Sequence, residues 1–326
     1  MADRLLEIKD LQVGFRVYGG ELKVLNGIHL TMEEGEKVGL VGETGCGKTT
    51  TAKSTLNILP VPPAKIFQGE ILFQGEDILK MGRNEVRKMR AQGISMIFQD
   101  PTAALNPVFT IGEQMMDAIR YSTPRNSLSK KERREKAIRA LQDVSLPDSE
   151  RILENYPIQL SGGMRQRICI AMALATEAQL LIADEPTTSL DVTIQDQVLR
   201  LLGKLVTEKE TSTMLITHSL GIVREWTDRV YVMYAGTMVE TARTRDLFSN
   251  PLHPYTKGLM KAVPKLTGEG IAEGIAGRIP DYLNPPAGCR FHPRCPHRMP
   301  ICEKETPALF PVTEDKHEVA CFLYKS

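Results

Sequence analysis

The sequence lacks any unbroken run of about eighteen apolar residues, which is the length that a membrane-spanning helix requires. Its N-terminus also lacks the basic-then-apolar pattern of a signal peptide. Neither sign of charge is in excess, because 41 Lys and Arg residues against 40 Asp and Glu residues give a formal net charge of +1. We therefore predict a chain without a transmembrane segment that stays on the cytosolic side, where it can lie against a membrane protein. The charge gives no indication of a nucleic-acid partner.

Cysteine is scarce over most of the 326 residues, and no internal repeat of roughly 20 to 50 residues is present. Only Cys46 and Cys169 precede a C-terminal group of four cysteines. Disulfides do not persist in a reducing compartment, so the group of four favours a metal site. Cys46 and Cys169 are interpreted as small, inert side chains. With 42% hydrophobic and 25% charged residues, the chain has the composition of an ordinary globular protein with one large and one smaller domain.

The stretch from Val41 to Thr50 is a candidate phosphate-binding loop. It follows an apolar strand and precedes a helix, so backbone N–H groups and the positive end of the helix dipole face one cavity. Lys48 supplies charge for the outer phosphates, and the Thr49 hydroxyl is suited to Mg²⁺. The predicted nucleotide-binding residues of the loop are Gly42, Gly45, Cys46, Gly47, Lys48, Thr49 and Thr50.

An acidic pair ends a second apolar strand, which covers residues 180–183. Phosphoryl transfer requires a metal clamped to phosphate oxygens, and we assign Asp184 to hold it. Glu185, one residue further on, is placed to polarise an attacking water. The plain alternative is an acidic pair that caps a helix.

The residues Ser161, Gly162 and Gly163 open another helix and form a second candidate anion site. One nucleotide cannot easily fill two such sites in one chain. The natural solution is a pair of domains that face head to tail, each lending its second site to the partner's nucleotide. Taken alone, the motif would be interpreted as a simple helix cap.

The pattern along the chain alternates between strands and helices. Two or three antiparallel strands are predicted over Leu5 to Met32, with a turn at Gly19 and Gly20. Further strands are expected at 69–74, 94–98, 180–183, 213–217 and 230–234. Helices dominate between Thr110 and Ile168, where Ser129 and Glu132 form a capping box, and Asp191 is expected to cap another helix. From about residue 250 onward proline is frequent and periodicity fades, which predicts a C-terminal appendage.

The order of these motifs resembles the nucleotide-binding subunit of an ABC transporter. The elements in order are Gly42–Thr49, Gln99, Leu160–Gly163, Asp184–Glu185, Ser189–Asp191 and His218. The resemblance implies an α/β P-loop NTPase fold, with a RecA-like core, an antiparallel β subdomain and an inserted helical subdomain at about 100–168. The expected domains are 1–250 for nucleotide binding and 251–326 for the appendage.

The resemblance also implies roles for single residues. Gln99 would couple Mg²⁺ and the attacking water to the helical subdomain, and His218 would contact the γ-phosphate. Ser161 and Gly163 would touch the γ-phosphate that the partner binds, and Asp191 would cross the dimer interface. A further aromatic side chain would stack on adenine, for which Tyr18 is the first choice and Phe15 the second.

Further motifs resemble the dipeptide and oligopeptide import branch, which also contains nickel and some oligosaccharide importers. They are Gln99–Pro101, Leu105–Pro107, Ile111–Gly112, Gln114, Val232–Gly236 and His253–Thr256. Two positions depart from that branch: Ile158 stands where histidine is usual, and Ser219 stands where aspartate is usual. Neither departure removes a ligand.

The four C-terminal cysteines, Cys289, Cys295, Cys302 and Cys321, do not have the spacing of a zinc ribbon or knuckle. Members of the branch resemble the segment 288–296, and some hold a [4Fe-4S] cluster on four such cysteines. We therefore predict a [4Fe-4S] cluster of structural role, with Zn²⁺ or free thiols as alternatives. The nearby histidines that could serve zinc are His292, His297 and His317.

The predicted function is ATP hydrolysis by a motor subunit of a peptide importer. The expected partners are a second, non-identical ATPase subunit, two membrane permease subunits and, indirectly, an extracellular peptide-binding protein. Three alternatives remain at this point. The first is a soluble ABC ATPase that acts on DNA or ribosomes, and the second is an importer of nickel or oligosaccharides. The third is a redox sensor formed by the cysteines that gates the ATPase.

Overall fold

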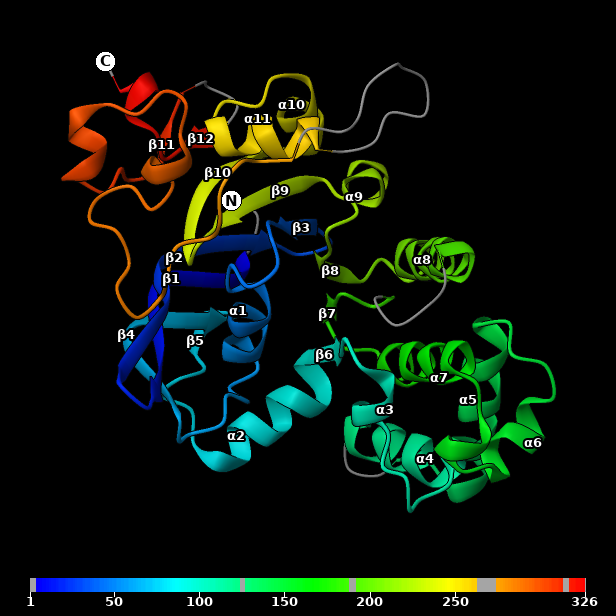
Figure 1. Ribbon diagram of the computed structural model, residues 1–326. Helices are drawn as coiled ribbons and strands as arrows, with labels where there is room; N and C mark the ends of the chain where they lie inside the picture. The colour runs from blue at the N-terminus through cyan, green and yellow to red at the C-terminus, as the bar shows by residue number, and fades with distance from the viewer. Residues whose placement is uncertain (1–3, 124–126, 188–191, 263–273, 313–316, 326) are drawn as a thin grey trace. The chain divides into compact units, whose positions relative to one another are not determined.

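The computed structural model describes residues 4–123, 127–187, 192–262, 274–312 and 317–325. The chain divides into two compact units. The first unit joins Met1–Lys80 to Ile216–Ser326, and the second is Met81–Leu215. Figure 1 shows the first unit in blue and in yellow to red, and the second in cyan to green.

A four-stranded antiparallel sheet in the order β2-β1-β4-β5 begins the first unit. Its strands are β1 (Arg4–Val17), β2 (Gly20–Glu33), β4 (Ala64–Phe73) and β5 (Glu76–Asp77). The predicted hairpin is confirmed: Tyr18 and Gly19 form the turn, and Gly20 opens β2 opposite Val17. Gly19 and Gly20 take φ of 100° and 146°. The strand expected from residue 69 begins earlier, at Ala64, because Ala64 pairs with Phe15 directly after the prolines.

A second set of strands in the first unit has the order β11-β12-β10-β9-β3. The bounds are β3 (Lys37–Val41), β9 (Arg229–Tyr234), β10 (Thr237–Arg243), β11 (Phe310–Pro311) and β12 (Glu318–Val319). Strands β3 and β9 run parallel, whereas β9 and β10 form an antiparallel hairpin. The sequence pattern did not predict β10, because polar Glu240 and Thr241 interrupt its apolar residues although both are buried.

Helices of the first unit lie against these strands, and α10 and α11 follow β10 in yellow in Figure 1. The α-helices are α1 (Lys48–Thr55), α9 (Leu220–Trp226), α10 (Thr244–Ser249) and α11 (Pro254–Lys261). Short 3₁₀ helices cover His292–Arg294, Pro300–Glu303 and Phe322–Tyr324.

Aromatic packing joins the C-terminal residues to the first unit. The rings of Tyr234 and Tyr255 have centroids 4.7 Å apart, and Phe291 lies 5.0 Å from Tyr234. All three side chains are buried in one hydrophobic cluster with residues of β9 and β10. Tyr255 and Phe291 thus belong to the core of these strands, whereas Leu252, Val319 and Cys321 form a second, smaller cluster of C-terminal residues. The expected boundary at residue 250 stays a prediction.

The second unit contains strands in the order β8-β7-β6 and most of the helices. Its strands are β6 (Ile94–Ile97), β7 (Leu180–Asp184) and β8 (Ser212–Ile216), the last of which ends at the unit boundary. Its helices are α2 (Arg83–Lys88), a π turn at Met89–Gly93, α3 (Pro101–Ala104), α4 (Ile111–Ser122), α5 (Lys130–Asp143), α6 (Ser149–Glu154), a 3₁₀ turn at Pro157–Gln159, α7 (Gly162–Ala175) and α8 (Val192–Glu208).

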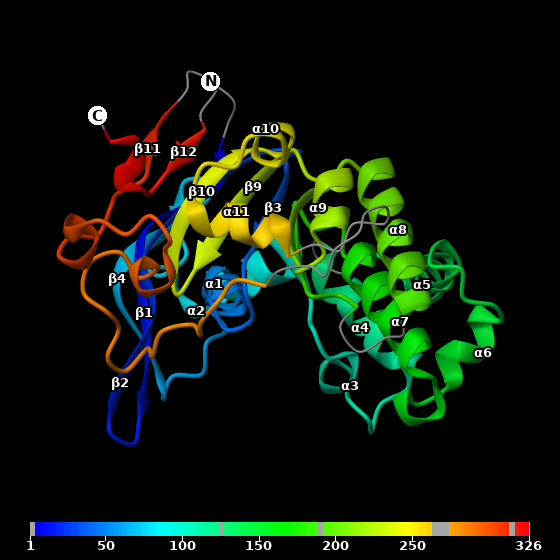
Figure 2. The ribbon, with the colours of Figure 1, turned by 45° about the horizontal axis from the view of Figure 1, so that its top comes forward.

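The helices α4, α5 and α7 pack against one another, and both views in Figures 1 and 2 show them side by side. The predicted capping box is confirmed, since Ser129 Oγ accepts a hydrogen bond from the Glu132 N–H at 3.3 Å. Thr110 and Glu113 form the same arrangement at the start of α4. Each box satisfies N–H groups that a helix start would leave unpaired, so local sequence fixes both helix starts.

Across the residues that the structure describes, no helix is both long and apolar enough to cross a membrane.

Candidate functional site

The phosphate loop follows the buried strand β3 and ends where α1 begins. Gly42 has φ of 152°, and a Cβ there would lie 2.1 Å from the Met233 carbonyl oxygen. Gly45 and Gly47 have φ of 83° and 107°, a region that other residues rarely adopt. Gly47 starts α1 without a side-chain cap, so no side chain competes for the first N–H groups of the helix. This is the geometry of an anion site at a helix N-terminus.

Lys48 lies folded over this loop and is buried, with 4% of its surface exposed. Its Nζ donates hydrogen bonds to the carbonyl oxygens of Gly42 at 2.8 Å and Glu43 at 3.1 Å. Lys48 Nζ also lies 3.8 Å from Cys46 Sγ. Burial raises the pKa of the Cys46 thiol although Lys48 opposes the shift. The thiol therefore stays protonated at neutral pH, which agrees with the interpretation of Cys46 as an inert small residue. Thr49 and Thr50 are half-buried in the first turn of α1.

Side chains far along the sequence also bind the loop. The Tyr255 hydroxyl accepts the Glu43 N–H at 2.8 Å, and the Tyr282 hydroxyl donates to the Gly45 carbonyl oxygen at 2.7 Å. Arg294 forms two hydrogen bonds of 2.7 Å and 3.0 Å with the Glu43 carboxylate. Sequence reasoning missed these roles, although Tyr255 and Arg294 lie in motifs that were noted as marks of the peptide-import branch.

The acidic pair lies in the second unit at the end of β7. Asp184 and Glu185 are 1% and 8% exposed. Gln99 Nε2 donates to Glu185 Oε2 at 2.7 Å. The two side chains meet because β6 and β7 are parallel and pair Ile97 with Ala183, so each is two residues beyond that pair.

Glu185 has a positive φ of 44°, which is uncommon for a residue other than glycine, asparagine or aspartate. Such backbone strain persists only where the surroundings enforce it, and it is enriched at functional sites. The alternative in which the pair merely caps a helix does not require this conformation.

Ser161 begins α7, and its Oγ accepts a hydrogen bond from the Met164 N–H at 3.3 Å. The side chain is exposed and Gly163 follows in the first turn. The helix cap that sequence reasoning held as the plain alternative is therefore present, and an exposed cap remains accessible to a ligand from outside the chain.

The other predicted nucleotide contacts are His218, Tyr18 or Phe15, and Asp191. His218 is exposed between β8 and α9. Tyr18 lies fully exposed at the turn between β1 and β2, whereas Phe15 is half-buried in β1. Asp191 lies outside the described residues.

The four C-terminal cysteines come together around one cavity. Cys289, Cys295, Cys302 and Cys321 all line it, together with His253, His292, His297 and other residues. A backbone hydrogen bond of 2.9 Å from the Cys289 N–H to the Cys302 carbonyl oxygen links two of the segments that line it. Burial and the neighbouring thiols raise the pKa of Cys289 to about 11. Among the described residues, however, no group of three His, Cys, Asp or Glu side chains is arranged to hold a metal ion.

Two nearby histidines have structural partners. His317 Nε2 lies 2.7 Å from Glu240 Oε1, and His317 is not among the residues that line the cavity. Burial lowers the pKa of His253 to about 4, so the ring is neutral and its Nδ1 accepts the Tyr255 N–H at 3.0 Å. His317 is thus not placed to serve as a zinc ligand in the way that the sequence allowed.

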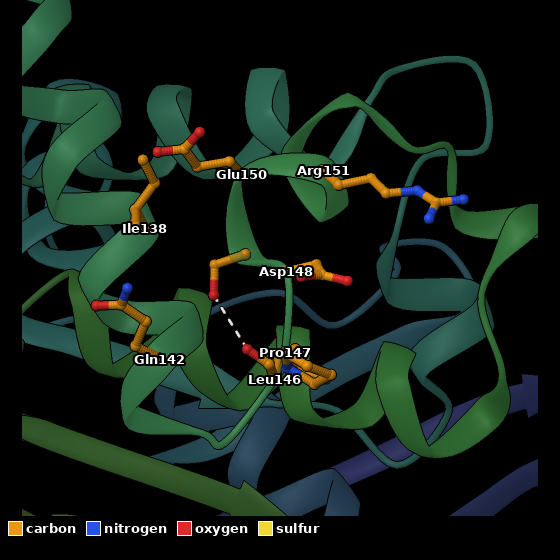
Figure 3. Close-up of a pocket in the computed structure, with 8 residues that line it drawn as sticks. Ile138, Gln142, Leu146, Pro147, Asp148, Glu150 and Arg151 are labelled. Carbon is orange, nitrogen blue, oxygen red and sulfur yellow. Dashed lines mark hydrogen bonds between the residues drawn. The ribbon is translucent and has the colours of Figure 1, made fainter.

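A hollow at the surface of the second unit contains none of the predicted site residues (Figure 3). It lies beside α5 and the start of α6, and the dashed line marks the hydrogen bond of 3.1 Å from Ser149 Oγ to the Leu146 carbonyl oxygen. Its charged residues are Asp148, Glu150 and Arg151, and nothing in their arrangement points to a substrate.

A glycine-rich loop at a helix start, a buried lysine over it and a buried carboxylate pair after a strand define a P-loop nucleotide hydrolase. The model of the ABC transporter family matches residues 25–188, and the model of the oligopeptide/dipeptide transporter C-terminal region matches residues 239–302. The chain belongs to the ABC transporter ATPase family.

Curated relatives match over nearly the whole chain. A dipeptide transport ATP-binding protein of Bacillus subtilis is 44% identical over 98% of this chain and 95% of its own length. An oligopeptide transport ATP-binding protein of Salmonella typhimurium is 44% identical over 94% of this chain and 90% of its own length. A solved dimeric post-hydrolysis ATP-binding cassette with ADP and Pi matches with a TM-score of 0.66 and 27% identity, covering 74% of this chain and 99% of that one.

These comparisons confirm the predicted family, the α/β P-loop ABC fold and the class of enzyme, an ABC-type ATPase. The roles of the single site residues and the domain boundaries remain predictions.

Proposed function

We propose that this chain is the ATP-hydrolysing subunit of an ABC importer that takes up dipeptides or oligopeptides, and that it lies at the cytoplasmic face of the membrane. The observation that carries the proposal is the pairing, in one chain, of the nucleotide site with the C-terminal region of the oligopeptide/dipeptide transporter family. The same pairing favours transport over the alternative of an ATPase that acts on DNA or ribosomes. Two permease subunits and, indirectly, an extracellular peptide-binding protein complete the proposed transporter.

In the proposed reaction, Lys48 binds the outer phosphates and the loop N–H groups hold their oxygens. Thr49, Asp184 and Gln99 offer a hydroxyl, a carboxylate and an amide oxygen, which are the oxygen ligands that suit Mg²⁺. Bound Mg²⁺ would neutralise charge on the phosphates. Glu185 accepts a proton from the attacking water, and the hydrogen bond from Gln99 supports its orientation. His218 contacts the γ-phosphate.

The second half of each nucleotide site would come from another ATPase subunit. Ser161 and Gly163 would contact the γ-phosphate bound by the partner, and Asp191 would cross the interface. Separately from these contacts, Tyr18 would stack on adenine. Because contacts to one ATP would come from two chains, ATP favours the closed pair and product release favours the open pair. We propose a non-identical partner, which a stable complex with a second ATPase chain would support.

We further propose that the four cysteines hold a [4Fe-4S] cluster of structural role. Four thiols that line one cavity have the donor chemistry that such a cluster requires. Cysteine thiolates also bind Zn²⁺, which is the alternative that the absorption spectra below distinguish.

Uptake measurements test the transport proposal. Deleting the gene in the source organism is expected to abolish uptake of a radiolabelled dipeptide or of a pentapeptide. The wild-type gene should restore uptake, whereas Lys48→Ala should not, because the loop loses its phosphate-binding charge. If both peptides still enter the deletion strain and Ni²⁺ uptake fails instead, peptide import is the wrong cargo.

Absorption spectra test the cluster. Protein purified without oxygen is expected to show a broad band near ~400 nm from iron–sulfur charge transfer, and Cys302→Ser should lose it. Cys169→Ala is the matched control, because Cys169 is buried in α7 and is not among the residues that line the cavity. If the protein is colourless and binds one zinc ion, the site is a zinc site and the cluster proposal is wrong. If it is colourless and binds no metal, the four cysteines are free thiols.

A further inference from the structure

The phosphate loop carries an acidic side chain where an anion has to bind. Glu43 directly follows Gly42, and its side chain is 25% exposed. An uncompensated carboxylate beside a triphosphate would repel it, and the repulsion is strongest where burial lowers the local dielectric. The loop therefore needs a cation that pairs with Glu43 and does not come from the nucleotide.

Arg294 supplies this cation from the C-terminal segment. Its side chain is 5% exposed. Besides the two bonds to Glu43, it donates to Tyr234 Oη at 3.3 Å and to the carbonyl oxygens of Ile275 at 3.0 Å and Ala276 at 2.8 Å. A guanidinium has five N–H groups, and these five bonds use all of them, so the side chain is fixed in one orientation.

Two tyrosine hydroxyls hold the same stretch of loop. Tyr255 accepts the Glu43 N–H, and Tyr282 donates to the Gly45 carbonyl oxygen. Both hydroxyls face the loop from the side of the C-terminal residues. Together with Arg294 they restrain the backbone of residues 43–45 and the side chain of Glu43.

We propose that Arg294, Tyr255 and Tyr282 are positioning residues for nucleotide binding. Arg294 neutralises Glu43, and the tyrosines hold residues 43–45 in the anion-binding conformation. Arg294 directly precedes Cys295, so order in the cysteine-bearing segment and nucleotide affinity are linked. Because such a coupling is reciprocal, bound nucleotide also stabilises the segment.

A charge-compensation experiment tests the role of Arg294 in the full-length protein. Binding of the non-hydrolysable analogue AMP-PNP with Mg²⁺ is measured by calorimetry. Arg294→Gln is expected to raise the dissociation constant roughly tenfold, because it leaves a partly buried carboxylate without its partner. The double variant Glu43→Gln with Arg294→Gln should recover most of that loss, since it removes the repelling charge. The loss should also shrink at high ionic strength, which screens charge but does not repair a misfolded loop.

Arg298→Gln is the matched control, because Arg298 lies on the same segment and pairs with Glu303 instead of the loop. It is expected to leave the dissociation constant unchanged. If the double variant binds as weakly as Arg294→Gln, or if Arg298→Gln is equally weak, Arg294 acts only through folding and the proposal is overturned.

Hydrogen exchange tests the reciprocal link with milder variants. AMP-PNP is expected to slow exchange in residues 275–294 of the wild-type protein, and Tyr282→Phe should weaken this protection together with nucleotide affinity. Tyr324→Phe removes a hydroxyl that donates to the Leu252 carbonyl oxygen at 2.9 Å and not to the loop, so it should change neither. Unchanged exchange in residues 275–294 on nucleotide binding would rule out the coupling.

Discussion

Replacing Glu185 by glutamine is expected to slow ATP hydrolysis by roughly 100- to 1,000-fold while MgATP still binds. Glutamine keeps the size and shape of the side chain but cannot accept a proton from water. The Gln99 amide can still donate to the new carbonyl oxygen, so the hydrogen bond of 2.7 Å need not be lost. Binding without turnover should therefore trap the ATP-bound pair of ATPase subunits.

Phosphate release and gel filtration with ATP measure the two parts of this expectation. Glu177→Gln is the matched control, because Glu177 follows α7 in the same unit and pairs with Lys136 at the surface. The control should keep the wild-type rate and should trap no complex. Turnover by Glu185→Gln at the wild-type rate would remove Glu185 from the proposed role of base.

The position of the acidic pair Asp184 and Glu185 at the end of a buried strand could be predicted from local sequence, whereas its catalytic role stays a proposal. A short apolar strand that ends in acidic residues places them at one sheet edge, and parallel pairing of β6 with β7 then brings Gln99 next to Glu185. The loop glycines could be predicted from their spacing before Lys48. The structure adds the reason at Gly42, where positive φ and the close Met233 carbonyl oxygen exclude a larger residue.

The hydrogen bonds that Tyr255, Tyr282 and Arg294 form with the phosphate loop could not be predicted, because they join residues more than 200 positions apart. Tyr255, Tyr282 and Arg294 each reach the loop from a segment whose composition shows no periodicity. Strand β10 was missed for a related reason: Glu240 is a buried acid, and its partners come from later parts of the chain. Tertiary contacts, and not local pattern, decide such positions.

Replacing Glu240 by alanine is expected to lower the free energy of unfolding by about 3 to 5 kcal/mol. The Glu240 carboxylate is fully buried in β10. It accepts the N–H groups of Leu252 at 2.7 Å and His253 at 2.9 Å, and it lies 2.7 Å from His317 Nε2. Alanine would leave these three buried donors without their acceptor, and each carries its own desolvation cost.

The variant is expected to open first around residue 240 and only then to unfold as a whole, because Glu240 connects β10 to the start of α11 and to β12. Urea unfolding followed by Trp226 fluorescence measures the free energy, and hydrogen exchange at residues 252–255 and 317–321 locates the opening. Glu318→Ala is the control, since Glu318 lies on β12 and is only half-buried. Because His253 also lines the cysteine cavity, the Glu240→Ala protein is expected to lose order there as well. A midpoint equal to that of Glu318→Ala would show that this polar network does not hold the C-terminal segment on β10.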